Sequence, residues 1–162
     1  DVREMGRDTT GVRGVALRPD DRVVSMVVVR RADATLLLVT EKGMGKVTDL
    51  SEYRVQGRGG KGIITGKLNE RTGMVVGLME VIQDDELMLI TKNGVTIRSS
   101  VNQIRNTGRN ASGVRLVNLD ANDVVCAVAR VVSEKEEGGD GELGDAELGD
   151  EQLGAGGEGD GE

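Results

Sequence analysis

The sequence predicts an all-β protein built from repeated units of short antiparallel strands. Tyr53 is the only aromatic residue among the 162, so the core must consist of Val, Leu, Ile and Met. Because β-branched side chains suit strands better than helices, this composition favours β-structure. Short apolar runs alternate with Gly or Asp turn signals, and a cationic glycine loop recurs at constant spacing. Such a period is typical of a repeat architecture.

The recurring loop has the pattern Gly-Arg, three variable residues and Gly. We call its three copies the marker loops; they are residues 5–11, 56–62 and 107–113, each 51 residues after the one before (57 − 6 and 108 − 57, counted at the first Gly). The middle copy reads Gln56-Gly57-Arg58-Gly59-Gly60-Lys61-Gly62. Its glycines permit positive φ and close backbone approach, and its two cations suit phosphate.

The first repeat, residues 2–52, is expected to continue from its marker loop into a turn, a strand and a hairpin. Pro19-Asp20-Asp21 is typical of a turn. The dense apolar run Val23–Val29 predicts a strand buried on both faces. Two further strands, Thr35–Thr40 and Lys46–Thr48, are expected to form a hairpin around Gly43.

The second repeat, residues 53–103, follows the same order. Strands are expected at Ile63–Leu68 and Met74–Ile82, followed by a hairpin with strands Leu87–Thr91 and Val95–Ser100. Asn93-Gly94 between these β-rich runs is the strongest short-range hairpin signal. The period therefore includes the hairpin turns as well as the marker loops.

The third repeat, residues 104–132, predicts strands at Val114–Leu119 and Val124–Val132 and holds no counterpart of the hairpin. About three blades of a radial array are therefore expected. Repeats of this kind bury their faces against neighbours, and open sheet edges call for closure. We expect the missing blades of a longer chain, which the start at Asp1 rather than Met also suggests, or a strand-exchanged homodimer.

Charge divides the chain into two parts. Residues 1–132 hold 20 Lys and Arg against 16 Asp and Glu, a net +4, whereas residues 133–162 hold one Lys against 12 acids, a net −11. The second part contains ten Gly and only scattered Leu, a composition that cannot offset the entropy of ordering. It is predicted to be a disordered acidic tail that competes with a polyanion for the basic part.

Arginine occupies the same positions of successive repeats. The copies after the first marker Gly are Arg7, Arg58 and Arg109, those four residues earlier are Arg3, Arg54 and Arg105, and a third position holds Arg13 and Arg115. Equally spaced cations on one rim would follow the phosphates of a polyanion. The absence of aromatic stacking platforms favours duplex over single-stranded nucleic acid. The alternative is that some of these arginines bind strand-edge carbonyls between blades.

Catalysis is not expected from this sequence. It contains no His and no paired-acid motif, and its one cysteine, Cys126, lies in an apolar run where a buried thiol is expected. No apolar run is long enough to span a membrane, and no metal site is predicted. The lone cysteine fits a reducing, cytoplasmic location.

The residues Gln56–Gly62 resemble a box of the form Q-R-R-G-G-K-G that characterises the C-terminal region of the DNA gyrase A family. Six of seven positions match, and Gly57 replaces a basic residue. The surrounding sequence is similar as well, including Met5–Gly14, Tyr53-Arg54 and Thr107–Val114, and the likeness extends over essentially all 162 residues. By resemblance, the box residues Gln56, Arg58, Gly59, Gly60, Lys61 and Gly62 bind DNA, and the other marker loops are degenerate copies.

The resemblance implies a β-pinwheel, a six-bladed ring of four-stranded antiparallel blades, of which this chain would form the last half. Its expected function is to wrap double-stranded DNA by backbone contacts, so that the ATP-dependent topoisomerase introduces negative supercoils. The region itself would be non-catalytic and free of cofactors. ATP, Mg²⁺ and gyrase B would act elsewhere in a bacterial cytoplasmic holoenzyme, together with the remaining blades and the N-terminal part of gyrase A. The equivalent part of topoisomerase IV, or a chromosome-condensation-regulator-like interaction propeller, are the alternatives.

Overall fold

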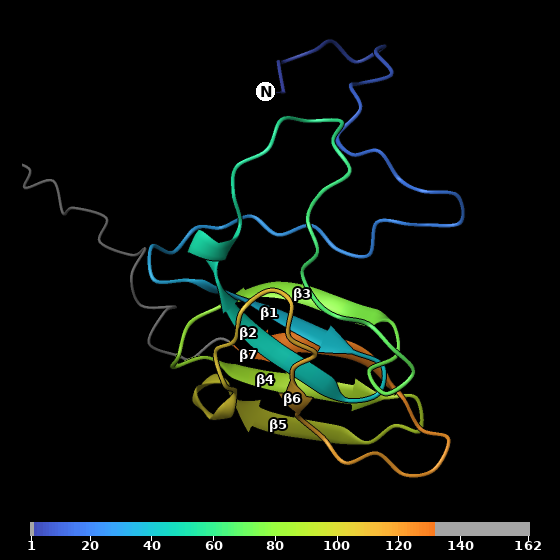
Figure 1. The fold of residues 1–162 in the computed structure, drawn as a ribbon, viewed down its shortest axis with the longest axis vertical. Coiled ribbons are helices and arrows are strands. Elements are labelled where there is room, and N and C mark those ends of the chain that lie inside the picture. Colours follow the sequence, from blue (N-terminus) through green and yellow to red (C-terminus); the bar gives the residue numbers. More distant parts are fainter. Residues whose placement is uncertain (1, 132–162) are drawn as a thin grey trace, which may run out of the picture.

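A computed structural model describes residues 2–131, and these residues form two antiparallel β-sheets without an α-helix (Figure 1). One sheet has the strand order β3-β1-β2-β6 and the other the order β5-β4-β7. Within the described part, no helix has the length and apolar character needed to cross a membrane. The elements are β1 (Thr35–Thr40), β2 (Met44–Asp49), the 3₁₀ helix η1 (Leu50–Glu52), β3 (Val75–Val81), β4 (Glu86–Thr91), β5 (Thr96–Ser100), the 3₁₀ helix η2 (Val101–Gln103), β6 (Val114–Arg115) and β7 (Val125–Val131).

Each sheet combines strands from successive sequence repeats. In the four-stranded sheet, the β1–β2 hairpin of the first repeat receives β3 from the second repeat on one side and β6 from the third on the other. In the three-stranded sheet, the β4–β5 hairpin of the second repeat receives β7 from the third. A hairpin thus pairs with an apolar strand that follows it in the chain, which ties neighbouring repeats together.

The two hairpins keep the 51-residue period, whereas β7 stands one residue short of it, because Val131 is 50 residues after Val81. Thr35 pairs with Val81 in the first sheet, and Glu86, 51 residues after Thr35, pairs with Val131 in the second. Both sheets have an irregularity at the same place, after Val39 and after Ile90. The hairpin turns also agree, with positive φ at Gly43 (72°) and Gly94 (87°). The predicted hairpins and the strands β3 and β7 are therefore confirmed.

The predictions for the apolar runs outside these sheets are wrong. Val23–Val29 is not a strand, and its side chains are largely exposed, reaching 85% for Met26. Ile63–Leu68 is irregular too, and a third sheet does not form among residues 2–131. The reason is the pairing rule above: β3 and β7 lie against hairpins that precede them, but residues 2–22 contain no hairpin.

The core lies between the two sheets. Leu37 and Val39 of β1 pack with Leu87 and Leu89 of β4 in one cluster of buried residues. The other face of the first sheet is also covered, since Leu38 lies against the irregular segment around Gly66. Cys126, expected to be buried, is exposed on β7. The predicted acidic tail, residues 133–162, lies outside the described residues.

Candidate nucleic-acid interface

The second and third marker loops are held by backbone hydrogen bonds to the segment that follows the preceding marker loop. Ala16 N–H donates to Gly60 O at 2.9 Å, and Lys67 N–H, 51 residues later, donates to Ala111 O at 3.4 Å. Each marker loop therefore lies against the segment that follows the preceding one. In Figure 1 the residues before β1 and those between η1 and β3 extend together away from the sheets. The 51-residue period of the sequence thus corresponds to a repeated contact between irregular segments of successive repeats.

The backbone conformation explains why the last residue of each marker loop is glycine. Gly11, Gly62 and Gly113 have φ angles of 80°, 76° and 86°, in the left-handed region that disfavours residues with a Cβ. Gly113 is also confined, because a Cβ there would lie 2.5 Å from Gly45 O. This close approach sets the third marker loop directly on β2.

The predicted basic residues fall into two environments. Arg109 is half-buried and its guanidinium donates to Ile64 O at 2.7 Å, which is the blade-to-blade role that the sequence left open. The other marker loop cations are exposed, including Arg58 and Lys61 together with Gln56. The remaining predicted positions that are exposed are Arg3, Arg7, Arg13, Arg54, Arg105 and Arg115.

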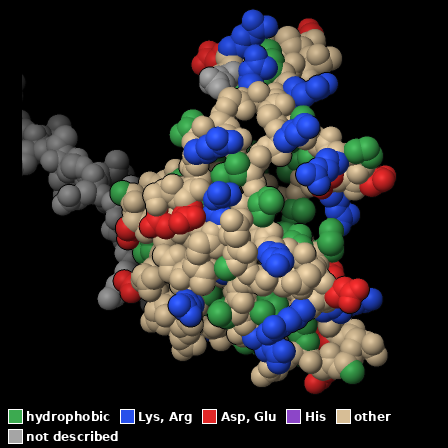
Figure 2. Space-filling view, in the orientation of Figure 1, with side chains coloured by type: hydrophobic (Ala, Val, Ile, Leu, Met, Phe, Trp, Pro, Cys, Tyr) green, Lys and Arg blue, Asp and Glu red, His purple; other side chains and the backbone are tan. Residues whose placement is uncertain are grey.

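Basic side chains are spread over the face of the molecule that Figure 2 shows. Figure 2 shows Lys and Arg from the irregular upper segments down over the front of the sheets, with isolated acidic side chains between them. A hollow near the β1–β2 turn is lined by Lys42, Arg71 and Arg115, from three different repeats, together with Asp120 and Asp123. Periodicity does not reveal Lys42 and Arg71, because neither is repeated: Asn93 and Asp20 stand at the matching positions.

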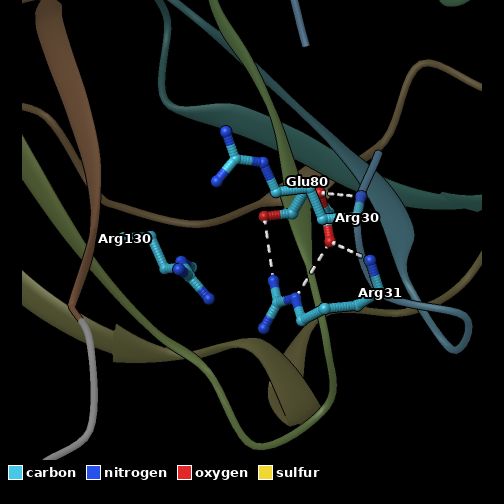
Figure 3. Close-up of a pocket in the computed structure, with 4 residues that line it drawn as sticks. All are labelled: Arg30, Arg31, Glu80 and Arg130. Carbon is cyan, nitrogen blue, oxygen red and sulfur yellow. Dashed lines mark hydrogen bonds and ion pairs between the residues drawn. The ribbon is translucent and has the colours of Figure 1, made fainter. Parts of the chain in front are cut away.

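A second ionic cluster lies between β3 and β7, which are end strands of the two sheets (Figure 3). The Glu80 carboxylate on β3 accepts hydrogen bonds from the backbone N–H groups of Arg30 and Arg31 (both 3.0 Å) and from Arg31 Nε (2.9 Å). Arg31 also donates to Asp85 (2.9 Å), and Arg130 of β7 donates to Asp85 (3.4 Å). The hydrogen bond to Asp85 raises the pKa of Arg31. This cluster joins the segment before β1 to both sheets.

Candidate metal centres are not found in the part of the chain that the structure describes. No group of three or more Cys, Asp or Glu side chains there could hold a metal ion. The chemistry that the described surface offers is that of exposed guanidinium and ammonium groups, which bind phosphate and carboxylate.

The antiparallel sheets each combine strands of successive repeats, and the basic loops recur at a constant period. These two features define a β-propeller-type repeat domain. The family model described as "DNA gyrase C-terminal domain, beta-propeller" matches residues 1–30, 34–81 and 85–131. The chain belongs to this family. The two later matches each contain a hairpin, a marker loop and an apolar strand, whereas the match over 1–30 contains a marker loop and an apolar run that is not a strand.

Known relatives agree with this assignment. The A subunit of DNA gyrase from Mycobacterium leprae is 44% identical over 137 residues, which is 85% of this chain and 11% of the relative. The A subunit of DNA gyrase from Kosmotoga olearia is 47% identical over 136 residues, 83% of this chain and 17% of the relative. The chain thus spans less than a fifth of these relatives.

Solved structures show the same fold. A DNA gyrase A C-terminal domain superposes with a TM-score of 0.73 at 31% identity, covering 81% of this chain and 44% of that one. The C-terminal domain of DNA topoisomerase IV gives a TM-score of 0.73 at 24% identity, covering 80% of this chain and 41% of that one. The similarity to the topoisomerase IV domain supports the fold alone.

Proposed function

We propose that this chain is a non-catalytic, DNA-wrapping part of a DNA gyrase A protein. Duplex DNA would lie along the marker loops and bend around the basic edge of the array, without base-specific readout. Wrapping of this kind would allow the ATP-dependent type IIA topoisomerase to introduce negative supercoils. ATP and Mg²⁺ would be used elsewhere in the holoenzyme, with gyrase B and the rest of gyrase A, in the bacterial cytoplasm.

The observation that carries the proposal is the periodic attachment of a marker loop to the segment after the preceding one, with exposed cations on the loops. The bond from Ala16 N–H to Gly60 O and its periodic counterpart repeat one geometry along the chain. Because phosphates recur regularly along a duplex, a regular series of exposed Arg and Lys suits its backbone better than it suits a compact ligand. The residues proposed as contacts are Gln56–Gly62, Arg3, Arg7, Arg13, Arg54, Arg105 and Arg115, with Arg109 as a positioning group.

The test is a titration of linear duplex DNA at several salt concentrations, with Arg58→Ala, Lys61→Ala and the double variant. Each lost phosphate contact should reduce the slope of log K against log salt by about 1. Glu70→Gln changes an exposed residue outside the marker loops and is the control for effects of substitution that do not involve these loops. An unchanged salt slope in the double variant would refute phosphate contact at this loop.

DNA length provides a second readout. If the duplex bends around several marker loops, affinity should rise with DNA length up to the wrapped length and then level off. A straight, single-loop contact would give affinity that no longer changes beyond a short duplex. In the holoenzyme, the double variant should reduce supercoiling more than relaxation, since only the former needs wrapped DNA.

A further inference from the structure

Lys46 is a buried cation that the proposed DNA contacts do not include. It lies on β2, and only 1% of its surface is exposed. Its Nζ donates to Gly108 O at 2.8 Å and to Arg109 O at 2.5 Å. An ammonium has three donors and is costly to bury without hydrogen-bond partners. The two carbonyl oxygens therefore offset part of the cost of burying Lys46.

Those two carbonyls belong to the third marker loop. The same loop is held by Thr107 N–H, which donates to Val47 O at 2.9 Å, and by the contact of Gly113 with Gly45. Arg109 meanwhile reaches Ile64 O of the second repeat. The loop of the third repeat is therefore fixed to both earlier repeats, and Lys46 provides the charged attachment.

We propose that Lys46 is a positioning residue for the DNA interface: its ammonium holds the third marker loop on the first sheet and sets that loop beside the second. This inference rests on the proposed function, because it assigns the loop's task to DNA binding. The second repeat has Ile97 at the matching position.

The charged groups around Lys46 make the attachment sensitive to pH. Burial lowers the pKa of Lys46, the charge of Arg109 lowers it further, and Glu52 of η1 opposes both. The residue paired with Lys46 on β1 is Leu38, and Gly66 approaches from the second repeat; neither is ionisable. The ammonium should therefore lose its proton below the pH at which exposed lysines do, about 10.4.

The experiment compares Lys46→Ile, which copies the second repeat, with Lys42→Met, which removes one exposed charge from the same hairpin. Hydrogen–deuterium exchange of the intact protein is followed in residues 104–116, with residues 86–100 as the internal reference. In Lys46→Ile, loss of the buried donor should speed hydrogen exchange of residues 104–116 by about tenfold or more relative to residues 86–100. Lys42→Met should leave that ratio unchanged.

Duplex DNA binding at low salt is measured on the same proteins. Lys46→Ile should raise the dissociation constant several-fold more than Lys42→Met; equal losses, or an unchanged exchange ratio, overturn the inference. If Lys46→Ile does not fold, the wild-type exchange ratio is measured from pH 7 upwards. The ratio should rise at a pH below that at which exposed lysines lose their proton, and a constant ratio overturns the inference. The exchange arm needs no DNA, so failure of the Arg58 and Lys61 variants to weaken DNA binding would refute the proposed function separately.

Discussion

At the scale of single residues, Arg58 and Arg109 occupy the same position of two repeats but have different surroundings. Arg58 is exposed, whereas Arg109 is half-buried and donates to Ile64 O. A guanidinium engaged with a carbonyl between repeats contributes mainly to stability, and an exposed one is available for phosphate. The sequence period left both roles open for these arginines, because it records identity and position but not the backbone that faces each side chain.

Alanine substitutions should separate these two roles. Arg109→Ala should reduce the free energy of unfolding by about 1–3 kcal/mol, because Ile64 O loses its charged donor. Its effect on the salt slope of DNA binding should be small. Arg58→Ala should do the reverse, lowering the slope while leaving urea denaturation unchanged. Equal loss of slope in both variants would show that Arg109 reaches DNA directly.

Glu80 should make stability depend on pH. Burial acts to raise the pKa of its carboxyl, but the hydrogen bonds from Arg31 and from the backbone N–H groups of Arg30 and Arg31 outweigh burial, so the pKa is lowered in the folded protein. The carboxylate therefore stabilises the fold fully above its unfolded-state pKa of about 4.3. This contribution is lost as the pH falls through the lower folded-state pKa.

Glu80→Gln tests this prediction. The variant should lose about 1–3 kcal/mol of unfolding free energy at pH 7, and its difference from wild type should shrink as the pH approaches 3. Glu86→Gln is the matched control, because Glu86 pairs with Arg98 on an exposed surface and such pairs contribute only about 0–1 kcal/mol. A difference for Glu80→Gln that stays constant from pH 7 to 3 would contradict the prediction.

At the scale of elements, the two hairpin turns have the same backbone but different surroundings. A Cβ at Gly43 would lie 2.7 Å from the Val117 side chain and 2.9 Å from Val117 O, whereas a Cβ at Gly94 would meet nothing within 4 Å. Both glycines have positive φ. The difference arises because Val117 and Leu119 of the third repeat lie over the Gly43 turn, whereas the Cβ position of Gly94 faces open space.

Alanine at each turn should therefore have different costs. Gly94→Ala should destabilise by about 1–2 kcal/mol, the cost of a left-handed non-glycine residue. Gly43→Ala should cost at least about 1 kcal/mol more, since overpacking adds to that strain. Urea denaturation of the two variants provides the comparison. Equal losses would mean that Val117 moves aside freely.

The hairpins and the strands β3 and β7 were predictable from sequence, whereas the irregular segments before β1 and between η1 and β3 were not. Asn93-Gly94 and Gly43 specify their turns locally, and the flanking strands agree with the structure. Val23–Val29 has an even stronger apolar pattern, yet it stays irregular because its hairpin partner is not among residues 2–131. Likewise the site's repeated arginines were found from their spacing, but Lys46 was not, because burial of a lysine depends on which carbonyls the fold brings to it.

At the scale of the whole molecule, the pairing rule identifies what an incomplete blade needs. β3 and β7 each lie beside a hairpin that precedes them by one repeat. The segment matching β3 in the first repeat is residues 24–30, and Ile63-Ile64 matches β6. A hairpin like β1–β2, positioned one period earlier, would bring these two segments into one sheet.

A copy of residues 35–51 joined directly ahead of Asp1 would stand in that register, because Asp1 matches Glu52 at the 51-residue period. We expect residues 24–30 to become protected from hydrogen exchange and the melting temperature to rise, because burying an exposed Val or Met side chain contributes about 1.5–3 kcal/mol. The same copy with Asp at the positions of Leu37 and Val39 is the control, since it keeps the length but cannot pack. If the intact copy leaves exchange of residues 24–30 unchanged, pairing with the preceding hairpin is not what orders the apolar strand of a blade, and the repeats would have to be stabilised by contacts between sheets instead.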